Sequence, residues 1–105
     1  MTQANDQIIP MEQFERAAAA LRVLAHPHRL AICAHLTSAQ VSVKQVAEHL
    51  GLPHNVVSQH LNAMKAHGLL ESQRQGKTVY YRVVDPRPLW LLECMRRHSP
   101  PPKDQ

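Results

Sequence analysis

Residues 53–84 constrain the fold more than any other part of the sequence, because the hydrophobic period changes within them. In PHNVVSQHLNAMKAHG, Val57, Leu61 and Met64 recur at helical spacing. The following LLESQRQGKTVYYRVV holds two runs of strand-forming residues around Gln75-Gly76-Lys77. The stretch therefore predicts a helix with one polar side, followed directly by a β-hairpin with a basic tip.

The rest of the chain predicts further helices, each marked by start or stop residues. A capping-box pattern of Ser42 and Gln45 opens one of them, and Gly51 ends it. The expected helices span 11–24, 28–37, 42–50, 53–67 and 85–98. Four helices, a small hairpin and a last helix predict a mainly α fold, the winged helix-turn-helix. We expect one such domain over residues 11–98, with residues 1–10 as a disordered arm and 99–105 as a disordered tail.

Charge is concentrated in the helix-and-hairpin segment. The chain has a net charge of +4. Residues 1–52 sum to zero, whereas residues 53–84 carry four basic side chains against Glu71. A concentrated positive charge is what a phosphate-binding surface needs, so nucleic acid is the expected partner.

Other features of the composition indicate a cytoplasmic protein. There is no secretory leader pattern and no long apolar run, so we expect neither export nor a membrane partner. The two cysteines, Cys33 and Cys94, lack a CxxC spacing, which suits a reducing compartment.

Several strings in this order resemble the ArsR/SmtB family of winged helix-turn-helix repressors. The strings are LAHPHRL at 24–30, VAEHLGL at 46–52, VSQHL at 57–61, GLL at 68–70 and GKTVYYR at 76–82. The resemblance covers roughly residues 11–98. It implies a homodimer that binds double-stranded operator DNA, represses transcription and is released by an inducing signal.

The resemblance places the DNA-binding residues on the fourth helix and the hairpin. Gln59 suits a bidentate contact to adenine, and basic residues of the hairpin suit phosphate or the minor groove. The expected DNA-binding residues are His54, Asn55, Ser58, Gln59, His60, Asn62, Lys65, Arg74, Lys77 and Thr78. The expected dimer interface joins the first and last helices through Phe14, Ala18, Leu21, Leu89, Trp90, Leu92 and Met95.

The family's inducer sites can also be sought in the sequence. The thiol-box positions of metalloid sensors hold Ser42 and Lys44, which cannot replace thiolates for a soft metal. The zinc site between last helices retains Asp85 and His98 but has Arg87 and Pro101 at its other positions, too few ligands for Zn²⁺. We therefore expect no metal and no cofactor.

A redox signal has more support from the sequence. Cys33 and Cys94 lie in the two helices that carry the thiols of redox-sensing relatives, although each is displaced along its helix. One residue turns a helix by about 100°. These thiols are therefore candidates for a redox signal, but they point in another direction than the thiols of those relatives. The alternative for a buried cysteine is a small apolar side chain.

Two other classes of function remain to be weighed. A winged-helix module that binds protein would need no charge concentrated in residues 53–84. An enzyme is not expected: Cys33 and His35 are two apart on a helix and so face apart, and neither a small-molecule substrate nor a glycine-rich loop is indicated.

Overall fold

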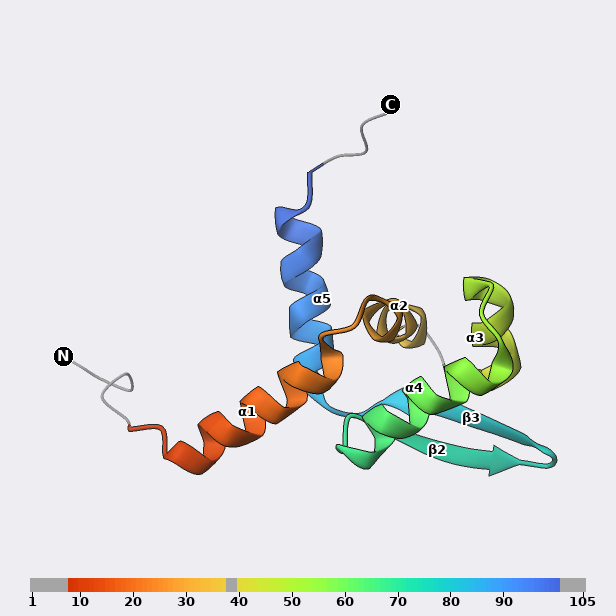
Figure 1. Cartoon of the computed structure of the whole chain (residues 1–105), viewed down its shortest axis with the longest axis horizontal. Coiled ribbons are helices and arrows are strands. Elements are labelled where there is room, and N and C mark those ends of the chain that lie inside the picture. The colour runs from red at the N-terminus through yellow and green to blue at the C-terminus, as the bar shows by residue number, and fades with distance from the viewer. Residues whose placement is uncertain (1–7, 38–39, 101–105) are drawn as a thin grey trace.

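The computed structural model describes residues 8–37 and 40–100. It contains helices α1 (Met11–Leu24), α2 (Pro27–Leu36), α3 (Val43–Leu50), α4 (His54–Ala66) and α5 (Pro86–His98), with strands β1 (Val41–Ser42), β2 (Leu70–Gln75) and β3 (Thr78–Val83). Helices α2, α3 and α4 pack over the sheet, while α1 and α5 extend away from it (Figure 1). The expected disordered arm and tail fall mostly on residues 1–7 and 101–105, which lie outside the described residues. No described helix combines the length and the apolar character needed to cross a membrane.

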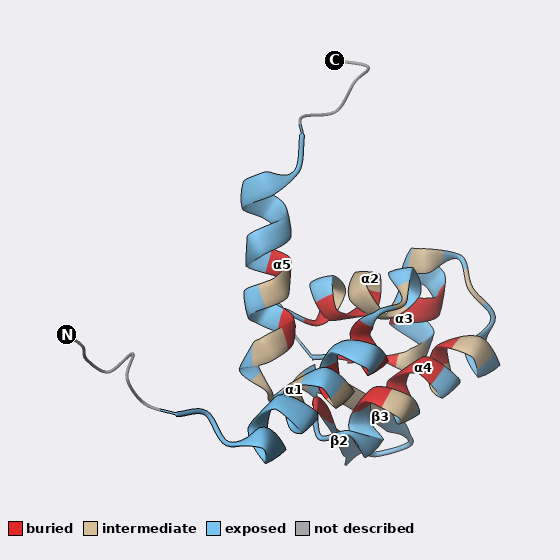
Figure 2. Cartoon of the chain, turned by 60° about the vertical axis from the view of Figure 1, so that its left-hand side comes forward, coloured by how far each residue is buried: buried red, intermediate tan, exposed pale blue. Residues whose placement is uncertain are grey.

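The core forms around the inward side of α4. Val57, Leu61 and Met64, expected to be buried from their spacing, have no exposed surface. They pack with apolar residues of α2, α3 and the sheet, including Ile32 and Val46. Figure 2 shows this buried layer between the helices and the hairpin. Burial of apolar side chains is the main stabilising contribution to such a small domain.

The local start and stop signals are confirmed. The Ser42 side chain accepts a hydrogen bond from the backbone N–H of Gln45, whose side chain accepts one in return from the Ser42 N–H. Gly51 ends α3 in the left-handed region at φ 68°, which a residue without Cβ adopts at low cost. Asp85 caps α5 by accepting from the N–H of Arg87.

The hairpin is confirmed, but the sheet has a third strand that the sequence analysis missed. The strand order is β1-β3-β2, and Val41 and Ser42 pair with Tyr81 and Tyr80 of β3. Two residues are too short to show a period of two, so this strand has no signal in the sequence. It forms because pairing satisfies the backbone groups just before α3.

Helix α2 is buried on the side that carries Ile32, Cys33 and Leu36, whereas Ala34 is exposed. Helix α2 contacts α4, α5 and β3 together, so its buried surface is wider than a single stripe.

Candidate nucleic-acid interface

The outward side of α4 is polar because its inward side is held in the core. Asn55, Gln59 and Asn62 are exposed, and Ser58 is half-buried. The helix is tied to the hairpin at its C-terminal end, where the Lys65 ammonium donates to the Ser72 hydroxyl at 2.7 Å. The structure therefore presents a row of amide and hydroxyl groups on a helix whose position relative to the hairpin is held by side-chain contacts.

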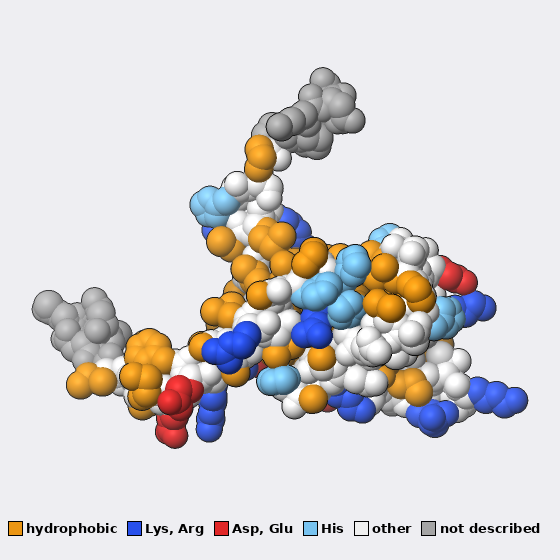
Figure 3. Space-filling view, in the orientation of Figure 1, with side chains coloured by type: hydrophobic (Ala, Val, Ile, Leu, Met, Phe, Trp, Pro, Cys, Tyr) orange, Lys and Arg blue, Asp and Glu red, His pale blue; other side chains and the backbone are white. Residues whose placement is uncertain are grey.

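The tip of the hairpin lies near the start of α4 and carries positive charge. Gly76 turns the chain at φ 65°, which places Arg74, Lys77 and Thr78 at the exposed end. Lys and Arg side chains are exposed at this end of the molecule as well as along α1 and the centre (Figure 3). Within the described part of the chain, neither Arg74 nor Lys77 takes part in an ion pair, so both charges are available to an anion.

Arg82, farther back on the hairpin, differs from these two residues. Its guanidinium pairs with the Glu71 carboxylate on the neighbouring strand, and both side chains are about half exposed. This pair neutralises one of the basic residues that the charge count of residues 53–84 included.

A hollow of about 510 Å³ lies between the starts of α3 and α4 and the tip of the hairpin. Its lining includes Lys44, His54, Lys77 and Thr78. Pro53 occupies the N-cap position before α4 and offers no side-chain cap, so no side chain satisfies the first backbone N–H groups of the helix. A helix N-terminus beside two ammonium groups suits an anion such as phosphate.

Lys44 was not among the expected DNA-binding residues. In the comparison with metalloid sensors, Lys44 stands only in place of a thiolate ligand. Its position two residues after the Ser42 cap, on the exposed side of α3, was a signal that could have placed it at the entrance of the helix-turn-helix.

His60 was expected to contact DNA, and the structure corrects this. The residue is only 8 % exposed, and its Nδ1 accepts a hydrogen bond of 3.1 Å from Arg29 Nε. Burial, followed by the nearby His26, Arg29 and His28, lowers the pKa of His60. The side chain therefore points toward α2 rather than to the polar side of α4.

Comparisons with known proteins agree with this geometry. A family model described as a helix-turn-helix domain matches residues 24–73. The HTH-type transcriptional repressor SmtB of Mycobacterium tuberculosis is 40 % identical over 76 residues, covering 72 % of this chain and 56 % of the repressor. The chain thus spans little more than half the length of that relative.

The transcriptional repressor PagR of Bacillus anthracis is similar over nearly its whole length. It is 36 % identical over 96 residues, which cover 90 % of this chain and 96 % of PagR. This chain belongs to the ArsR/SmtB family. The crystal structure of PagR superposes with a TM-score of 0.74 at 32 % identity, covering 82 % of this chain and 99 % of PagR.

A second solved ArsR-type structure is similar in fold. It is the solution structure of Mb0332 from Mycobacterium bovis, described as a homodimeric winged helix-turn-helix DNA-binding domain and a possible ArsR-family regulator. It superposes with a TM-score of 0.74 at 25 % identity, over 90 % of this chain and 88 % of that one. The winged helix-turn-helix fold expected from the sequence is confirmed.

A second surface of the chain, on α1 and α5, exposes apolar side chains. Much of both helices is exposed (Figure 2). The exposed fraction is 52 % for Phe14, 53 % for Leu21 and 67 % for Trp90, and Leu89 and Met95 are also more than two-fifths exposed. Ala18 is exposed beside them. Apolar side chains at this density are unusual on the surface of a monomer.

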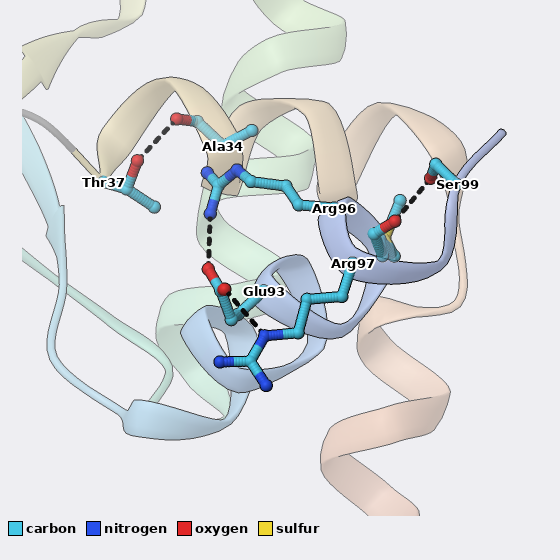
Figure 4. A network of polar contacts seen from close by, with 7 residues as sticks. Ala34, Thr37, Glu93, Arg96, Arg97 and Ser99 are labelled. Carbon is cyan, nitrogen blue, oxygen red and sulfur yellow. Dashed lines mark hydrogen bonds and ion pairs between the residues drawn. The ribbon is translucent and has the colours of Figure 1, made fainter. Parts of the chain in front are cut away.

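Leu92 was expected in the same dimer interface, and the structure places it elsewhere. It is 6 % exposed and belongs to the core of the protomer, where α5 packs against α2. Beyond it, α5 is exposed, and its Glu93 pairs with Arg97 at 3.1 Å and Arg96 at 3.4 Å (Figure 4). These exposed pairs add little stability.

The two thiols lie in different environments. Cys33 is fully buried, and its Sγ is 3.6 Å from the Met64 Sδ. Burial raises the pKa of the Cys33 thiol to about 11, which disfavours the reactive thiolate. Cys94 is exposed on α5 beside Trp90. The redox role stays a prediction, and the environment of Cys33 in this conformation disfavours it.

Asp85, one of the two retained positions of the family's zinc site, has structural partners. Its carboxylate accepts from the Arg87 backbone N–H at 2.8 Å and from the Arg87 guanidinium at 2.7 Å. Hydrogen bonding by Arg87 lowers the pKa of Asp85. This carboxylate is engaged as a helix cap and in an ion pair.

Proposed function

We propose that the protein is a homodimeric transcriptional repressor that binds double-stranded operator DNA through α4 and the β2–β3 hairpin. The observation that carries the proposal is the meeting of three anion-binding features on one face. These are the uncapped start of α4, the ammonium group of Lys44 beside it, and the basic hairpin tip with Arg74 and Lys77. The names of the relatives SmtB and PagR, both repressors, support the same function.

Base contacts come from the exposed polar side of α4 in the major groove. Gln59 is exposed and suits bidentate recognition of adenine, with Asn55 and Ser58 beside it on the N-terminal half of the helix. Asn62 and Lys65, which bond to Tyr81 and Ser72, hold the helix to the hairpin and contribute less to base contact.

Phosphate contacts come from the rim of this surface. Lys44 and His54 lie at the hollow beside α4, and Arg74, Lys77 and Thr78 lie at the hairpin tip. These contacts supply affinity for any sequence and fix the orientation of the helix in the groove.

Dimerisation joins the exposed apolar residues of α1 and α5 across a two-fold axis. Phe14, Leu21, Leu89, Trp90 and Met95 supply the apolar area, which a second copy would cover. The homodimeric description of Mb0332 supports this assembly. Two copies present two α4 helices, and a pair of half-sites about one helical turn apart follows from that symmetry.

The test is selection of duplexes from a random-sequence library, followed by fluorescence anisotropy with the selected site and a scrambled duplex of equal length. We expect enrichment of a site with two-fold symmetry and tighter binding to it than to the scrambled duplex. A winged-helix module that binds protein would show no enrichment. Absence of enrichment and of salt-dependent DNA affinity would refute the proposal.

A further inference from the structure

Three histidines gather at one point on the protomer, away from the hollow and the hairpin tip. One ring nitrogen from each of His26, His28 and His60 lies within 4.8 Å of the other two. The His26 and His60 ring centroids are 4.5 Å apart, and the His28 ring lies 5.4 Å from His26 and 5.8 Å from His60. Histidine side chains are visible together near the start of α2 (Figure 3).

We propose that His26, His28 and His60 bind one Zn²⁺ ion per protomer and thereby link the start of α2 to α4. Neutral imidazole is a good ligand for Zn²⁺, and three histidines leave a fourth position for water in a tetrahedral site. His28 is exposed and His26 half-buried, so an ion can reach the cluster from solvent. His60, nearly buried, forms the inner side of the site.

Two of the rings accept hydrogen bonds that must be replaced by bonds to the metal ion. The His26 Nδ1 accepts from the His28 backbone N–H at 3.1 Å, and the His60 Nδ1 accepts from Arg29 Nε at 3.1 Å. A neutral ring that accepts at Nδ1 carries its proton on Nε2. Coordination through Nε2 therefore requires the proton to move to Nδ1 and the hydrogen bond there to break.

The replacement of these hydrogen bonds determines which contacts the ion removes and which it adds. Arg29 loses its bond to His60 but keeps its Nη1 bond to the Val23 carbonyl at 3.0 Å, which holds it near the end of α1. Its positive charge lowers the affinity for a cation, so the site is weaker than one made from thiolates. In return, the ion joins the α1–α2 junction directly to α4.

No metal was expected from the sequence, because these histidines do not follow a known spacing of metal ligands. His26 and His28 flank Pro27, and their partner His60 lies on another helix. The fold brings His60 to them because Val57, Leu61 and Met64 fix which side of α4 faces inward.

The test uses the full chain without a histidine tag, freed of metal with a chelator. Zn²⁺ is titrated in competition with a chromogenic chelator, and Co²⁺ absorption reports the coordination number. We expect one ion per protomer in the wild type. Two variants remove ligands with little risk to folding: His28→Gln, at an exposed position, and His26→Asn, which retains a side-chain acceptor for the helix cap.

Each variant should weaken Zn²⁺ binding by about tenfold or more, because even residues behind the ligands change affinity by that much. The control is His35→Gln together with His49→Gln, a ring pair stacked at 4.1 Å that is not part of a three-ligand cluster in the described residues. Its affinity should equal that of the wild type. Absence of stoichiometric binding, or undiminished binding in His28→Gln and His26→Asn, would overturn the proposal.

Discussion

Replacing Lys77 by alanine should reduce the salt dependence of DNA binding by a predictable amount. Lys44, Arg74 and Lys77 are the cations around the hollow and the hairpin tip, which makes six in a homodimer. If each neutralises one phosphate, the slope of log K against log salt is about −5.4, and affinity falls about 10³-fold between about 50 and 200 mM salt. Lys77→Ala leaves four cations, so the slope becomes about −3.6 and the fall about 10²-fold.

The assay is fluorescence anisotropy with a scrambled duplex over this range of salt, after circular dichroism has shown that the variant is folded. Arg82→Ala is the matched control, because it removes the same charge from the same hairpin but from a residue paired with Glu71. Its slope should stay near that of the wild type. Equal changes of slope in the two variants would refute the reasoning, since net charge rather than position would then explain both.

Further predictions concern base recognition, the core, pH and assembly. Gln59→Ala should weaken the selected site by about 1–3 kcal/mol more than a scrambled duplex, as anisotropy would show; equal losses would assign Gln59 to the backbone. Leu61→Ala, at a position with no exposed surface, should lower the free energy of unfolding in urea by about 2–5 kcal/mol, and a loss below about 1 kcal/mol would contradict the packing described. Burial and the neighbouring His49 lower the pKa of His35, so the unfolded chain binds more protons and the free energy of unfolding falls as pH drops through the ordinary value of 6.5. In urea unfolding, His35→Gln should lose less free energy of unfolding over this pH range than the wild type does. An identical loss in the two proteins would count against this reasoning. Trp90→Glu should shift the protein toward the monomer in light scattering, because it places a charge in the proposed apolar interface; an unchanged dimer mass would exclude Trp90 from that interface.

The helix boundaries and the hairpin could be predicted because their signals are local. The capping box of Ser42 and Gln45 acts over one helical turn, and Gly51 and Gly76 each mark one residue of left-handed backbone. The spacing of the apolar residues on α4 predicted its buried side in the same way. Such signals depend on neighbours in the chain, so they can be recognised before the fold is known.

The candidate site could be predicted only in part. The exposed polar residues of α4 and the basic hairpin tip follow from spacing and charge. Lys44 is marked in the sequence only by its place just after the Ser42 cap, and its contribution becomes visible in the hollow that three elements form. The loss of Arg82 to an ion pair depends on the strand register that places it opposite Glu71.

The sequence by itself thus determined the order of elements, their ends and the polar side of α4, since those depend on contacts within a few residues. Only the tertiary structure decided the positions of His60 and Leu92. Each lies on a helix with several similar residues, so the sequence does not show which of them is buried. His60 lies inward because the buried residues of α4 fix its inward side, and there it meets Arg29, His26 and His28; Leu92 is buried because α5 packs against α2. These outcomes depend on how separate helices pack against one another, which local sequence does not encode.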